Sequence, residues 1–246
     1  MNEQRNGGDS GPDKRLLEDV LDEVLSFNFR SLRTLRDIFV RPGHVTRVFA
    51  DGDRETYTPT MRIWFGVVSW LFLLSIIWGG FGELIIRASE AAGDPISRFT
   101  VDGRRDMDQV ASALSATAAA LYIPLNSALI IMGVHVLRGF NNELSFIQTA
   151  QGYFIPLTAM TVSSTFFVIA SVFDARALLV APFANYACFF LIAFDVVRRV
   201  FSRNLFGAFM RTLILTFVVF VLSTMATVLT FLISIVAALM TVQPNF

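Results

Sequence analysis

Five stretches of this chain carry no ionisable side chain, and this feature limits the possible folds more than any other. They lie between Arg62 and Glu83, between Asp108 and His135, between Gln151 and Asp174, between Arg176 and Asp195, and after Arg211. A transmembrane helix needs about 20 predominantly apolar residues. The chain is also 54% hydrophobic and holds 25 phenylalanines in 246 residues, which is unlike a soluble domain. We therefore predict an all-α polytopic membrane protein with a transmembrane domain of residues 61–246. Its five helices would lie near 62–84, 110–136, 152–173, 177–194 and 212–241.

The distribution of basic residues predicts the orientation of these spans. Residues 1–60 are polar and charged throughout, unlike a signal peptide, so we expect the first span to direct membrane insertion. If the spans alternate in direction, 15 of the 20 Lys and Arg residues fall on the side of the N-terminus. The positive-inside rule then predicts a cytoplasmic N-terminus and a C-terminus outside. In the bacterial inner membrane, where we expect this protein, that C-terminus would be periplasmic.

The segment before the first span divides into two parts. Residues 1–12 are rich in glycine and charge, which predicts a disordered tail. Residues 13–60 predict cytosolic amphipathic helices. In the first helix, apolar side chains recur at helical spacing and acidic ones lie opposite. The apolar residues are Leu17, Val20, Leu21, Val24 and Leu25, and the acidic residues are Glu18, Asp19, Asp22 and Glu23.

A second helix is predicted from about residue 29 up to Pro42-Gly43. Arg30, Arg33 and Arg36 stand three residues apart, with Arg41 following. Leu32, Leu35 and Phe39 are expected on another side of this helix. A basic helix with an apolar face suits the anionic surface of the inner leaflet. An alternative is that this segment packs on the bundle as a cap.

A second basic group follows the fourth predicted span. Arg198, Arg199 and Arg203 lie in DVVRRVFSRNLFGAFMR beside apolar residues. We interpret them as contacts to lipid phosphates or to a partner protein. The alternative is that they only set the topology.

Three spans carry a proline followed by polar side chains. Pro124 lies near Tyr122 and Asn126, Pro156 precedes Thr158, and Pro182 precedes Asn185 and Tyr186. Proline kinks a helix, and lipid cannot satisfy an amide, so these residues are candidates for an intramembrane polar site. They could line a substrate path, or they could bond between helices and serve packing only.

Small residues recur every four positions in two spans. Ser112, Ala116 and Ala120 form one row, and Ala226, Thr230, Ser234 and Ala238 form the other. Such rows allow close helix contact. We expect these two helices either at the centre of the bundle or at a contact between copies of the chain.

The sequence lacks the usual signs of catalysis or metal binding. Cys188 is the only cysteine, His44 and His135 are the only histidines, and no nucleotide-binding or hydrolase motif occurs. We expect no cofactor, no metal and no enzymatic activity. A formal net charge of zero gives no reason to expect nucleic acid as a partner.

The stretch RTLRDIFVRPG, followed by VFADGDRETYTPTMRIWF, resembles a bacterial family of membrane proteins of unknown function. The residues that carry the resemblance are Arg41, Pro42, Gly43, Gly52, Tyr57 and Pro59. That family has an N-terminal zinc ribbon and histidines after the second span. Here the ribbon is missing, and Glu143, Gln148 and Gln151 stand where the histidines are expected. The plan of five spans also looks like that of the Yip family of trafficking proteins.

Two functional hypotheses follow from these features. The first is a non-enzymatic membrane protein that organises anionic inner-leaflet lipids, further copies of itself or other membrane proteins through its basic helices. The second is a small channel or transporter with a path along the kinked spans two to four.

Overall fold

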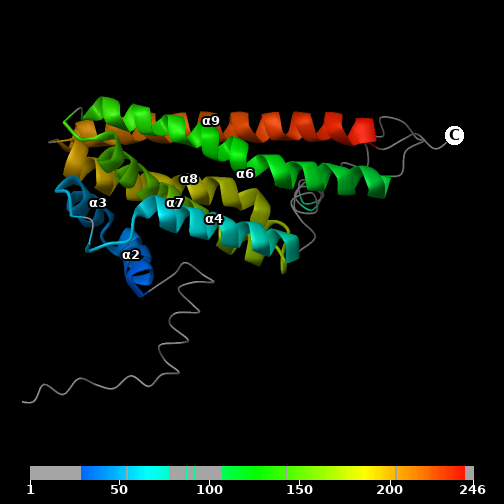
Figure 1. Cartoon of the computed structure of the whole chain (residues 1–246), viewed down its shortest axis with the longest axis horizontal. Coiled ribbons are helices and arrows are strands. Elements are labelled where there is room, and N and C mark those ends of the chain that lie inside the picture. The colour runs from blue at the N-terminus through cyan, green and yellow to red at the C-terminus, as the bar shows by residue number, and fades with distance from the viewer. Residues whose placement is uncertain are drawn as a thin grey trace, which may run out of the picture.

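The chain is all-helical in the part that the structure, a computed structural model, describes. That part comprises residues 29–53, 55–77, 87, 91, 107–141, 143–202 and 204–241. The helices are α2 (Phe29–Val40), α3 (Pro42–Ala50), α4 (Thr60–Ile77), α6 (Met107–Phe140), α7 (Phe146–Ala170), α8 (Ala177–Val196), the π-helix η2 (Val197–Phe201) and α9 (Leu205–Thr241). Figure 1 shows the long helices running side by side, with α2 and α3 together at one end.

Among the described residues, four helices are long and apolar enough to cross a membrane. The qualifying segments are Ala116–Phe140, Phe146–Ala170, Ala177–Phe201 and Leu205–Ala238. These segments agree with the second to fifth predicted spans, which are therefore candidate membrane-spanning helices. The first predicted span begins in α4, whose apolar part is the shorter Thr60–Leu74. Its predicted continuation to residue 84 lies outside the described residues, as do the predicted tail of residues 1–12 and the predicted helix from residue 13.

The bundle is built from two groups of neighbours. Helix α6 packs along α9, while α7 packs against both α8 and α4. The predicted row of small residues on α9 is buried, with Ala226, Ser234 and Ala238 fully shielded and Thr230 nearly so. That row therefore supports close packing inside the bundle. Ala116 and Ala120 of α6 are exposed instead.

The three prolines of the predicted spans, Pro124, Pro156 and Pro182, lie inside helices that continue past them. Pro156 is buried in α7, whereas Pro124 in α6 and Pro182 in α8 are exposed. Only Pro156 therefore faces the interior of the bundle.

The end of the bundle that holds α2 and α3 is part of one continuous core. Ile38 of α2 and Val45 of α3 are completely buried in the same apolar cluster as Trp64 of α4 and Phe154 of α7. The Trp64 indole N–H donates to the Thr161 hydroxyl at 3.1 Å. Helices α2 and α3, joined at Arg41 and together called the hairpin, thus pack onto the long helices of the bundle.

Arg211, in the second turn of α9, ties further helix ends together. Its guanidinium donates to the carbonyl oxygen of Phe201 and, at 3.3 Å, to that of Phe140. These carbonyls lie at the ends of η2 and α6, where helices leave acceptors without partners. The same cation lies 5.6 Å from the centre of the Phe140 ring.

Candidate functional site

Helix α2 faces the bundle with its polar side. Ser31, Thr34 and Asp37 are buried together with Ile38. The Ser31 and Thr58 hydroxyls lie 3.2 Å apart, and the Thr58 backbone N–H donates to the Thr34 hydroxyl at 3.0 Å. These contacts hold α2 beside the chain that leads into α4, which begins at Thr60.

A buried carboxylate lies at the centre of this contact. The Asp37 side chain is fully buried, accepts from the Tyr57 hydroxyl at 2.8 Å and pairs with Arg41 at 3.2 Å. Burial opposes its ionisation, but the Tyr57 and Arg41 hydrogen bonds and the charges of Arg41 and Arg36 outweigh burial and lower the pKa of Asp37. Burial, together with the bond to Asp37, raises the pKa of Tyr57. Asp37 is thus a charged anchor for Tyr57.

Arg33 completes the surroundings of Tyr57. Its guanidinium lies 5.7 Å from the centre of the Tyr57 ring, and the Arg30 side chain donates to the Tyr57 carbonyl oxygen. A cation at this distance from an aromatic face is favourable. Three side chains of α2, those of Asp37, Arg33 and Arg30, therefore contact Tyr57. Tyr57 is one of the residues that carry the family resemblance.

The start of α3 is fixed by the end of α8. The Gly43 backbone N–H donates to Asp195 Oδ2 at 2.8 Å, and Arg199 Nε donates to Asp195 Oδ1 at 2.8 Å. An acidic group at a helix N-terminus is stabilising because the first N–H groups lack partners inside the helix. A Cβ added at Gly43 would lie 2.8 Å from the Asp195 carbonyl oxygen and 2.3 Å from Arg199 Cδ. Only glycine fits this close approach, which explains the Pro42-Gly43 pair at the start of α3.

Two glutamines connect three further helix ends. Gln148 closes a capping box with Ser145 at the start of α7, and its amide donates to the Ala50 carbonyl oxygen of α3 at 2.7 Å. The Gln151 side-chain oxygen accepts from the Thr60 backbone N–H at 2.6 Å. Two of the three positions where the resemblance implies histidines, Gln148 and Gln151, therefore carry amides that hydrogen-bond to other helix ends.

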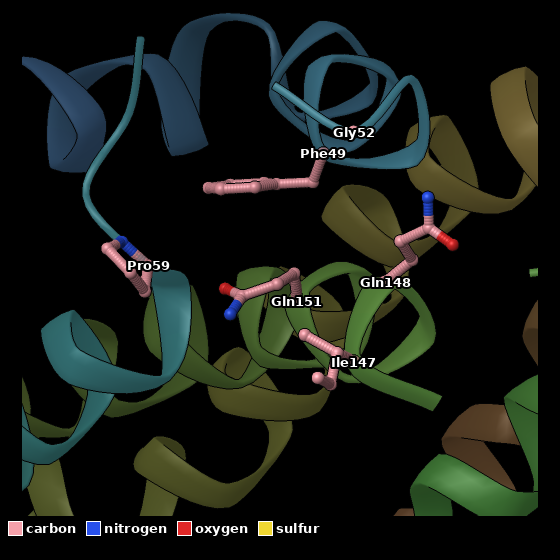
Figure 2. Close-up of a pocket in the computed structure, with 6 residues that line it drawn as sticks. All are labelled: Phe49, Gly52, Pro59, Ile147, Gln148 and Gln151. Carbon is pink, nitrogen blue, oxygen red and sulfur yellow. The ribbon is translucent and has the colours of Figure 1, made fainter. Parts of the chain in front are cut away.

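A pocket of about 220 Å³ opens between these helix ends. Figure 2 shows the Phe49 ring and Pro59 on one side of it, with the amides of Gln148 and Gln151 on the other. Gly52, with a φ of 87°, and Ile147 complete the lining. None of the described lining residues is charged.

The outer face of α2 differs sharply from the buried face. It consists of Phe29, Leu32, Arg33, Arg36, Phe39 and Val40, all exposed. Phe29 is 86% exposed, Val40 66% and Leu32 56%. The helix is therefore amphipathic with its polar buried side chains toward the protein and its apolar and basic side chains outward, the reverse of a soluble surface helix.

The predicted arginines fall into two groups. Arg30, Arg41 and Arg199 hydrogen-bond to carbonyl or carboxylate oxygens of the protein itself. Arg33, Arg36 and Arg198 are exposed. Arg203 lies outside the described residues.

Two of the predicted intramembrane polar residues make hydrogen bonds inside the bundle. Asn185 of α8 donates to the Ser164 hydroxyl of α7 at 2.7 Å, and Thr158 donates to the Phe154 carbonyl oxygen of its own helix. The Asn126 side-chain oxygen is buried without a hydrogen-bond partner among the described residues.

The two tyrosines of this set are half-buried. Tyr186 packs edge-on against Phe220 at 5.2 Å. Tyr186 therefore lies against α9.

The residues that organise the hairpin contact were largely missed by sequence reasoning. Ser31, Thr34 and Asp37 recur at helical spacing, and Asp37 stands four residues before Arg41. That spacing was the available signal for a second, polar face.

Among the described residues, no three His, Cys, Asp or Glu side chains group in a way that could hold a metal ion.

The described part of the chain is all-helical, and four of its helices are long and apolar enough to cross a membrane. Residues 30–72 match the model of a family described as "Protein of unknown function (DUF3667)". The matched range covers most of α2, all of α3 and most of α4, so it coincides with the hairpin contact just described. Neither the curated proteins nor the solved structures gave a match.

Proposed function

We propose that this protein is a non-enzymatic membrane protein that organises anionic phospholipids through the outer face of α2. The observation that carries the proposal is the reversed polarity of α2, with Asp37 buried and Phe29, Leu32 and Val40 exposed. A helix at a membrane surface inserts its apolar side chains at the level of the headgroups. Arginines of the same face extend toward the phosphates.

The position of α2 supports this proposal. Its polar side contacts Tyr57 and Thr58, and the apolar helix α4 starts two residues later at Thr60. The outer face of α2 therefore lies at the level where α4 would enter the hydrocarbon. Because α3 is fixed to Asp195 and Gln148, the bundle sets this depth.

The proposal includes the predicted topology. Five spans, with α4 and the residues after it as the first, place α2 in the cytoplasm beside the inner leaflet of a bacterial membrane. This plan is similar to that of the Yip family.

We favour lipid organisation over a transport path along α6, α7 and α8. Thr158 bonds to its own helix, and Asn185 bonds to Ser164 of the neighbouring helix. The first satisfies a hydroxyl within one helix, and the second joins two neighbouring helices.

The test compares two charge-neutralising variants in nanodiscs with equal amounts of phosphatidylglycerol and phosphatidylcholine. Arg36→Gln removes a side chain that is 70% exposed on α2. Arg176→Gln removes an exposed arginine at the opposite end of the bundle, between α7 and α8. Native mass spectrometry measures the ratio of the two lipids that stay bound.

An arginine near an anionic surface contributes about 1 kcal/mol. We therefore expect Arg36→Gln to lower the bound phosphatidylglycerol ratio roughly fivefold, and Arg176→Gln to leave it unchanged. An equal ratio in the unmodified protein and Arg36→Gln would refute the proposal.

A further inference from the structure

The pocket between α3, the start of α4 and α7 holds a hydrogen-bond donor without a partner. Gln151 Oε1 accepts from the Thr60 backbone N–H at 2.6 Å and from the Thr60 hydroxyl at 2.7 Å. Because a backbone N–H can only donate, these bonds turn the amide oxygen toward Thr60 and leave Nε2 on the other side. Among the described residues, none accepts a hydrogen bond from Gln151 Nε2. The amide of Gln148, by contrast, is occupied at both ends, by Ser145 and Ala50.

The side chains around this donor are mostly apolar, and the pocket opens beside an apolar surface. Figure 2 shows the Gln151 amide extending between Pro59 and Ile147, below the Phe49 ring. Phe49 is buried, whereas Pro59 is exposed and Ile147 is 56% exposed. Met61, in the first turn of α4, is exposed as well. The mouth of the pocket therefore adjoins the apolar starts of α4 and α7.

We infer that this pocket binds the glycerol-ester region of one phospholipid, whose ester carbonyl accepts from Gln151 Nε2. Pockets for drug-sized ligands measure about 300–1,000 Å³. This pocket measures about 220 Å³, so it has room for part of a larger molecule. The first methylenes of the acyl chain pack against Phe49 and Ile147, and the charged headgroup stays outside because none of the described lining residues is charged.

The depth of the pocket selects this occupant. Gln151 bonds to Thr60, the residue where the apolar helix α4 begins, so the pocket lies where α4 would leave the headgroup layer. Ester carbonyls lie between the headgroups and the hydrocarbon, and they are uncharged acceptors that match an unpaired amide N–H. The site goes beyond the proposed function, because it is separate from the outer face of α2 and reads the ester rather than the headgroup charge.

The experiment offers the full-length protein two phosphatidylcholines in the same nanodisc. One has ester-linked chains and the other has ether-linked chains of equal length, so the lipids differ in the carbonyl but share the headgroup. Native mass spectrometry measures their ratio in the complex that retains one lipid. One neutral hydrogen bond corresponds to roughly a fivefold preference for the ester lipid. Equal retention would leave Nε2 to water and overturn the inference.

Gln151→Glu tests the donor itself. The substitution keeps an oxygen to accept from Thr60 and replaces Nε2 by a second oxygen, so the ester preference should disappear. Hydrogen exchange of the first α4 amides checks that the Thr60 contact is intact. A carboxylate that only repelled phosphocholine would lower both lipids equally and leave their ratio unchanged. An ester preference that persists in Gln151→Glu would therefore overturn the inference.

A second variant tests the pocket without touching the bonds of Gln151. Ile147→Trp places a larger side chain at the mouth, so it should lower the ester preference even if Gln151→Glu does not fold. Ile214→Trp is the matched control, because Ile214 is a 47% exposed residue of α9. The same ratio in both tryptophan variants would exclude this pocket as the site.

Arg36→Gln separates this site from the outer face of α2. Both lipids of the experiment carry the same headgroup, so Arg36→Gln should keep the ester preference. Its loss in Arg36→Gln would place the bound lipid on α2 and overturn the pocket assignment. An ester preference that depends on Gln151 stands even if the phosphatidylglycerol test of α2 fails.

Discussion

Replacing Gly43 by alanine should release the start of α3 from the end of α8. An added Cβ would lie 2.8 Å from the Asp195 carbonyl oxygen and 2.7 Å from Asp195 Oδ2, the acceptor of the Gly43 N–H. The backbone oxygen cannot move away without shifting α8, so α3 must shift and weaken that hydrogen bond.

The magnitude follows from two costs of the same displacement. Overpacking a close contact costs about 1–3 kcal/mol. A hydrogen bond to a charged group contributes about 1.5–3 kcal/mol. Because one movement causes both, we expect a loss of about 3 kcal/mol, which corresponds to roughly a 100-fold increase in local opening.

Hydrogen exchange of the α3 amides, followed by mass spectrometry in nanodiscs, measures this opening. Gly139→Ala is the matched control, because an added Cβ there meets no atom within 4 Å. In α6 this alanine should be neutral or favourable by up to about 1 kcal/mol. Unchanged exchange of α3 in Gly43→Ala, or equal acceleration in both variants, would refute the reasoning.

Three further predictions concern other contacts. Asp37→Asn should loosen the hairpin and speed α2 exchange at neutral pH, because the charge paired with Arg41 is lost. Since the pKa of Asp37 is lowered in the folded protein, this contribution is present above the ordinary carboxyl pKa and should fade as pH falls below about 4. Ser234→Leu should lower the thermal unfolding midpoint, because Ser234 is fully buried in α9. Trp64→Phe should cost about 1 kcal/mol of stability in detergent unfolding, through loss of the bond to Thr161.

The sequence predicts the second to fifth long apolar helices well because charge is costly in hydrocarbon. The absence of charge between Gln151 and Asp174 predicts α7 to within a few residues at its C-terminal end. Its N-terminal end begins earlier, at Phe146, because Ser145 and Gln148 cap the helix outside the apolar run. The composition of the apolar run therefore does not predict this polar extension at the start of α7.

The orientation of α2 was harder to predict. Arginines three residues apart drift around a helix of 3.6 residues per turn, so Arg30 and Arg36 do not share a face. Arg36 points outward, whereas Arg30 reaches the Tyr57 carbonyl. The predicted end of this helix before Pro42-Gly43 is confirmed, since α2 ends at Val40.

Long-range pairing was out of reach for sequence rules. Gly43 and Asp195 are 152 positions apart, and no local pattern links them. Pro42 was predicted as a helix stop, but it also begins α3, because proline suits the first helical position. The close approach of Asp195 then explains why glycine follows.

The most direct test of the central claim is the membrane depth of Leu32. A spin label at this position, in the Cys188→Ala background, is placed in nanodiscs that contain phosphatidylglycerol. Collision rates with oxygen and with a water-soluble nickel complex report the depth, and a label at the exposed loop residue Glu143 serves as the aqueous reference. We predict frequent oxygen collisions and few nickel collisions at position 32. Nickel collisions as frequent as those at position 143 would contradict the placement of α2 in the membrane surface.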